Sequence, residues 1–250
     1  MNSQEHIHTL RVQLLAMSRL SQRALDDSIK GYQARNLDFS RHVCTAHREI
    51  GDHHRRIKEL CREVMNGDIA KAPDLRFAFA ALNIGTALDA TYTAAAEIAR
   101  DTIRLLETGS IQHCEALEDM AQLMNGSIRL CIVALFEKDA RHAETLLRHL
   151  DSLQLRELHS VDSRPHVDHR TERYDDFERA MTQRLGEVAK QAHEIADAIA
   201  FWLEGNSCIA APAEDKHIGV ALSPARQQDD MCHMQSIEAA GRKVTQSILC

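Results

Sequence analysis

A proline followed by an aspartate opens one of the longest helical patterns of this chain, and a similar pattern returns in its second half. Pro73 ends one helix and Asp74 begins the next, because proline disrupts a helix interior whereas aspartate caps a helix start. The helix that follows them is predicted to end near Gly109, and its counterpart to run between Asp168 and Gly205. This recurrence predicts an internally duplicated helical protein.

The composition favours helices over sheets. The 250 residues include only 10 glycines and 4 prolines, and the 44% of hydrophobic residues are enough for a sizeable core. No segment alternates polar residues with β-branched or aromatic ones, so no strand is predicted. The fold class expected from the sequence is therefore all-α, with two tandem three-helix bundles and a C-terminal extension.

Charge and targeting signals narrow the classes of protein. A net charge of −7 without a basic stripe argues against nucleic-acid binding. No run of apolar residues is long enough for a transmembrane segment, and the first residues lack the apolar core of a signal peptide. The seven cysteines form no Cys-x-x-Cys motif. These features predict a cytoplasmic protein with reduced thiols.

Apolar residues at steps of three and four predict six helices. Breaks at 36–38 and 137–139 occupy corresponding places, which predicts a first repeat over 1–110 and a second over 111–205. Residues 206–250 are interpreted as a linker followed by a further helix that begins near Asp230. The predicted core stripes are Leu10, Leu14, Met17, Leu25, Ile29 and Tyr32; Val43, Ile50, Ile57, Leu60 and Val64; Leu75, Phe79, Leu82, Leu88, Tyr92, Ala95 and Ala99; Leu117, Met120, Met124, Ile128, Cys131 and Leu135; Leu146, Leu147, Leu150 and Leu153; and Tyr174, Phe177, Met181, Leu185, Val188, Ala192, Ile195, Ile199 and Trp202.

Two aromatic residues anchor this core prediction. Phe79 is expected to be buried within the first repeat. Trp202 is expected to be substantially buried against the helix that starts near Leu117. If both are core residues, truncating either to alanine costs about 3–5 kcal/mol of stability.

Two sequence segments then indicate a family. Asp74-Leu75-Arg76, followed by Phe77-Ala78-Phe79-Ala80-Ala81-Leu82, and the aromatic end Phe201-Trp202-Leu203-Glu204-Gly205 resemble the PhoU family over about residues 8 to 205. The resemblance implies a cytoplasmic, non-enzymatic regulator of phosphate uptake and phosphate-responsive signalling. Its implied partners are a phosphate ABC transporter, a sensor histidine kinase and a second copy of the chain.

The resemblance also implies a metal motif, which this chain has largely lost. The family carries Glu-x-x-x-Asp on the third helix of each repeat, where both carboxylates share one helix face. The first pair falls on Asp89 and Thr93, and the second on Gly186 and Lys190. Only Asp89 keeps a carboxylate.

A further acidic position of the family falls on His47, and its counterpart is Asp151. The candidate metal residues are therefore Asp89, His47 and Asp151. The candidate cofactor is a divalent or ferric metal ion, with none assigned as certain.

Two other interpretations stay open. A metal-binding helical bundle would use ligands among the fifteen histidines, with His142 and His149 as the remaining candidates beside His47 and Asp89. A general helical adaptor would have no connection with phosphate. The run His53-His54-Arg55-Arg56 is interpreted as a solvated helix face. No nucleophile elbow, phosphate loop or dinucleotide-binding motif is present, so catalysis is not expected.

Overall fold

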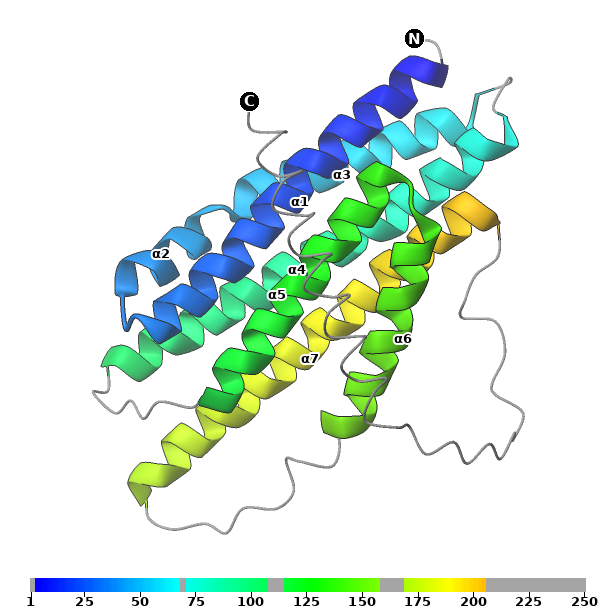
Figure 1. Ribbon diagram of the computed structural model, residues 1–250. Helices are drawn as coiled ribbons and strands as arrows, with labels where there is room; N and C mark the ends of the chain where they lie inside the picture. The colour runs from blue at the N-terminus through cyan, green and yellow to red at the C-terminus, as the bar shows by residue number, and fades with distance from the viewer. Residues whose placement is uncertain (1–2, 68–70, 108–114, 158–168, 206–250) are drawn as a thin grey trace, which may run out of the picture.

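The computed structural model describes residues 3–67, 71–107, 115–157 and 169–205, and these residues form helices and no strand (Figure 1). The described helices, in chain order, are α1 (Ser3–Gln33), α2 (Leu37–Thr45), α3 (His47–Met65), α4 (Ala72–Glu107), α5 (Glu115–Glu137), α6 (Ala140–Glu157) and α7 (His169–Glu204). The predicted all-α class is confirmed. None of these helices is long and apolar enough to cross a membrane.

Two helices of 36 residues, α4 and α7, run side by side through the centre of the molecule (Figure 1). Helix α4 packs against α1, α2 and α3, whereas α7 packs against α5 and α6. The α4–α7 interface therefore joins two helical bundles into one body. A smaller contact between α1 and α5 adds to this interface.

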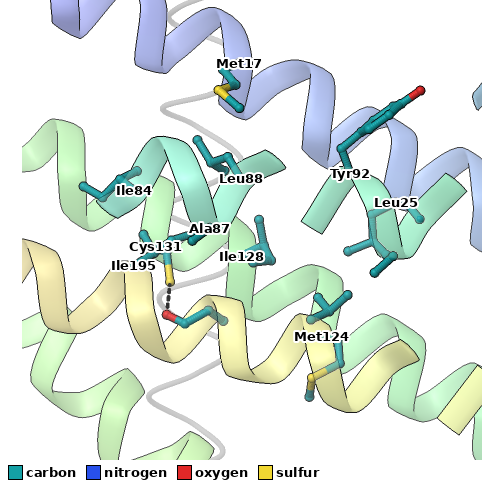
Figure 2. Close-up of a cluster of buried hydrophobic side chains, with 14 of the residues drawn as sticks. Met17, Leu25, Ile84, Ala87, Leu88, Tyr92, Met124, Ile128, Cys131 and Ile195 are labelled. Carbon is teal, nitrogen blue, oxygen red and sulfur yellow. Dashed lines mark hydrogen bonds between the residues drawn. The ribbon is translucent and has the colours of Figure 1, made fainter. Parts of the chain in front are cut away.

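The core consists of the apolar stripes that the helices turn toward one another, as Figure 2 shows for Met17 of α1, Leu88 of α4 and Ile195 of α7. All three side chains are buried. The thiol of Cys131 on α5 donates a hydrogen bond to the Ala192 carbonyl of α7, with 3.2 Å between sulfur and oxygen (Figure 2). Most residues of the predicted stripes are confirmed as core, and the side chains of Leu153 and Tyr174 lie outside the described residues.

The two predicted breaks have the same local conformation. Arg35 and Lys138 both adopt a positive φ, of 52° and 56°. The next residue, Asn36 or Asp139, then caps the following helix by accepting a hydrogen bond from a backbone N–H two residues later. This correspondence agrees with the predicted duplication. The boundary at residue 110 lies outside the described residues, as does all of 206–250, so the division into 1–110, 111–205 and 206–250 stays a prediction.

The single helix predicted to carry the stripe from Val43 to Val64 is wrong, because the chain breaks it at Ala46 into α2 and α3. The Tyr92 hydroxyl of α4 donates to the Val43 carbonyl at 2.8 Å. That carbonyl is the one to which the N–H of His47 would bond in an uninterrupted helix. A tertiary hydrogen bond therefore competes with a helical one, and the sequence pattern contains no sign of it.

The predicted burial of Phe79 is wrong, since 49% of its surface is exposed, and Leu75 is 37% exposed. Their neighbour Phe77, absent from the predicted stripe, is only 2% exposed. Helix α4 lies between α1, α3 and α7, so its buried face is wider than a single stripe. Trp202 is half-buried, and its ring contacts that of Phe77 on α4, with 4.8 Å between the centroids. Its predicted contact with the helix that starts near Leu117 stays a prediction.

Candidate functional site

A histidine–aspartate pair connects α3 and α4 where the family resemblance places its first carboxylate. Nδ1 of His54 lies 3.2 Å from Oδ2 of Asp89. The His54 side chain is 10% exposed and that of Asp89 is 39% exposed, so the pair extends from the core to the surface. Thr93 occupies the second family position. Its hydroxyl donates a hydrogen bond to the backbone carbonyl of Asp89, four residues earlier in the same helix.

Local sequence explains why His54 is buried. It lies between Ile50 and Ile57 at helical steps of four and three, on the stripe of α3 that faces α4. A glycine on α4 allows the close approach: a Cβ at Gly85 would lie 3.3 Å from Ile57 and 3.7 Å from the His54 ring. The expected solvated face over 53–56 is therefore wrong for His54, and the step pattern of α3 could have revealed it.

Burial sets the protonation of this histidine. Desolvation lowers the pKa of His54 below its ordinary value, and Lys58 lowers it further, whereas Asp89 acts in the opposite direction. The neutral ring then donates from Nδ1 to the Asp89 carboxylate, which leaves the Nε2 lone pair as an acceptor. Nε2 is buried and has no hydrogen-bond partner among the described residues.

The pair offers too few donors for a metal ion. Across the described residues, no group of three or more His, Cys, Asp or Glu side chains is arranged to hold one. The ring of His47 stacks on Tyr92, with 6.1 Å between centroids. Asp151 belongs to α6, and its side chain lies outside the described residues. The described donors do not fit a metal ion, and the assignment of Asp89, His47 and Asp151 stays a prediction that elemental analysis of chelator-free protein tests.

The remaining histidine candidates have other contacts. Nδ1 of His142 lies 2.8 Å from Oδ2 of Asp139, the residue that caps α6, so it takes part in a helix start. The side chain of His149 lies outside the described residues. His53 contacts Gln13 of α1 at 2.7 Å. None of these described contacts brings a third donor to His54 and Asp89.

His54 gives the first testable prediction, which concerns the pH dependence of stability. A histidine whose folded-state pKa is lowered contributes stability above its unfolded pKa of about 6.5, and this contribution is lost as the pH falls through the folded value. The melting temperature of the wild-type protein should therefore fall more between pH 7.5 and pH 5 than that of His54→Gln. Thr93→Val, a neighbouring change that removes no titratable group, should keep the wild-type dependence; equal slopes for wild type and His54→Gln would contradict the assignment.

The arrangement of α1 to α7 defines a class of protein, an antiparallel helical bundle of the PhoU fold. A crystal structure of PhoU from Pseudomonas aeruginosa matches with a TM-score of 0.65 at 18% identity, covering 82% of this chain and 100% of that one. The phosphate transport system regulatory protein PhoU from Streptococcus pneumoniae matches with a TM-score of 0.71 at 14% identity, covering 82% and 99%.

Residues 14–102 match the family description of the PhoU domain. Residues 14–102 of this chain therefore form a PhoU domain, and the resemblance predicted from the sequence is confirmed. The match includes α4 up to Thr102 and thus contains both His54 and Asp89. No curated protein matches the chain in sequence.

Proposed function

We propose that this protein is a cytoplasmic regulator of phosphate uptake and of phosphate-responsive signalling. The observation that carries the proposal is the PhoU domain over residues 14–102, on a fold shared with a protein described as a phosphate transport system regulator. Its partners would be a phosphate ABC transporter and a sensor histidine kinase, and it would act as a homodimer. It would restrain signalling when phosphate is plentiful.

Action through protein contacts agrees with the chemistry of the described residues. Burial raises the pKa of the Cys61 thiol to about 12, and burial also raises the pKa of Cys131. Both thiols are held by backbone carbonyls, at Ala78 and Ala192. Neither supplies a thiolate near neutral pH, so both serve packing rather than nucleophilic chemistry. Long helices with solvated outer faces offer surface for partners instead.

Deletion of the gene tests the proposal. We expect phosphate-regulated expression to stay high in phosphate-rich medium, because the restraint is gone, and the wild-type gene supplied on a plasmid should restore repression. The measurement is expression from a phosphate-responsive promoter at high and low phosphate. Unchanged expression under both conditions would favour a helical adaptor without a connection with phosphate.

The partners need a separate test. Tagged full-length protein, purified from native cells under phosphate-rich conditions, should retain the transporter ATPase or the sensor kinase, as mass spectrometry would show. Sedimentation velocity of the purified protein tests the homodimer. Recovery of neither partner, together with a monomer at micromolar concentration, would contradict the proposed mode of action.

A further inference from the structure

Helix α4 carries a second apolar stripe, in which Leu75 and Phe79 lie at the surface and Leu82 packs against the edge of the core. Leu75, Phe79 and Leu82 follow one another at steps of four and three, so they share a helix face, and Phe77 lies on the opposite one. Phe79 is 49% and Leu75 37% exposed, and Leu82 is half-buried. Phe201 of α7 extends this face, with its ring edge-on to Phe79 at 5.6 Å between centroids. We name these four residues the aromatic patch.

Such a patch needs an occupant. Exposed phenylalanine and leucine side chains at neighbouring positions form a contiguous apolar patch in water, and contiguous patches of this kind mark interaction sites more often than scattered apolar residues do. The other helix faces near this end carry paired charges, such as Arg56 with Glu59 and His6 with Glu63. The patch is thus an apolar surface beside a polar one, and this is the arrangement of a docking site.

The chain itself leaves α7 beside the patch. Gly205 adopts a φ of +81° and its N–H bonds to the Phe201 carbonyl, so the glycine ends the helix in a left-handed cap. A Cβ at Gly205 would lie 4.0 Å from the guanidinium of Arg76, which follows Leu75 in α4. The described part of the chain therefore ends at Gly205, next to the aromatic patch.

We propose that the segment 231–248 of the same chain binds the aromatic patch. Its sequence places Met231, Met234 and Ile237 at helical steps of three, with Val244 and Ile248 further on. Methionine adapts its shape to aromatic rings and makes favourable sulfur–aromatic contacts. The two similar solved structures align over 100% and 99% of their own lengths, but over only 82% of this chain. This chain therefore has residues that they lack. This inference is independent of the proposed function.

Chain length favours the chain's own segment over a second copy. The residues between Gly205 and Met231 can span up to about 80 Å when extended, far more than the patch requires. A segment of the same chain is present at the aromatic patch at an effective concentration on the order of millimolar. A second copy of the protein at micromolar concentration is about a thousand times more dilute and competes poorly for the patch. Weak apolar contacts are therefore sufficient for docking within one molecule.

Photo-crosslinking of the full-length protein tests the inference. With Phe79 replaced by p-benzoylphenylalanine, illumination should join residue 79 to the tryptic peptide 227–242, as tandem mass spectrometry would show. The same probe at Phe39, 37% exposed on α2 at the opposite end of the bundle (Figure 1), is the matched control and should not capture that peptide. A mixture of 14N- and 15N-labelled protein should yield no mixed-isotope crosslinks.

A change in the segment completes the test without touching the bundle. Met234→Asp with Ile237→Asp should lower the crosslink yield at position 79 by about tenfold or more, because each buried apolar side chain accounts for roughly a tenfold change in an equilibrium constant. Unchanged circular dichroism would show that the bundle is still folded. Mixed-isotope crosslinks would assign the patch to a second copy, and an unaltered yield or no capture of 227–242 would also overturn the proposal.

Discussion

Replacing Phe77 by alanine is expected to lower the free energy of unfolding by about 3–5 kcal/mol. The side chain is 2% exposed and contacts the Trp202 ring at 4.8 Å, and the guanidinium carbon of Arg11 lies 5.3 Å from its centroid. Truncation removes contacts with α1 and α7 together and leaves a cavity between them. Chemical denaturation monitored by circular dichroism measures the loss.

Phe79 is the matched control for this prediction, two residues away on the same helix. It is 49% exposed, so Phe79→Ala should cost only about 1 kcal/mol. The sequence pattern predicted a cost of about 3–5 kcal/mol for truncating Phe79. The structure shows that Phe77 is the buried residue, so the large cost is now expected at Phe77. Equal losses for the two variants would show that α4 does not have the orientation described here.

Gly31→Ala is expected to destabilise the protein by about 1–2 kcal/mol, although alanine is the better helix former. A Cβ at this position would lie 2.3 Å from the buried Ser40 hydroxyl oxygen of α2 and 3.3 Å from the Ser40 backbone nitrogen. The glycine allows α1 and α2 to approach at the turn that joins them. The measurement is chemical denaturation: the denaturant concentration at the midpoint should fall, whereas the dependence of the unfolding free energy on denaturant concentration should stay unchanged.

Gly51→Ala provides the comparison, because nothing lies within 4 Å of a Cβ at that helical position. This variant should gain about 0.5–1 kcal/mol from helix propensity alone. The variant Gly31→Ala with Ser40→Ala should recover part of the loss, since the hydroxyl that obstructs the methyl group is gone. Stabilisation by Gly31→Ala alone would refute the close contact between α1 and α2.

The helices could be predicted because their apolar residues repeat with the helical period and their ends carry capping residues. Asn36 and Asp139 were recognisable as breaks, and both cap the next helix. The position of the third helix followed from Pro73, which belongs to the first turn of α4. The break at Ala46 could not be predicted, since it follows from the Tyr92 hydroxyl of another helix.

The candidate site was predictable only in part. Asp89 was identified from the family motif, but its partner His54 was assigned to a solvated face. The steps from Ile50 through His54 to Ile57 contained the correct signal. A histidine is ambiguous in such a pattern, because it is polar enough for the surface and small enough for a core when one ring nitrogen has a partner.

The sequence by itself determined that this protein is helical and where most helices begin and end, because these properties depend on local periodicity and capping. Its segment 74–82 also indicated which family its first half matches. Only the tertiary structure decided which of two apolar stripes on α4 is buried. Both stripes satisfy the helical period, and the choice depends on where α1 and α7 lie. Phe77 is therefore a core residue, and Phe79 remains on the surface as part of the aromatic patch.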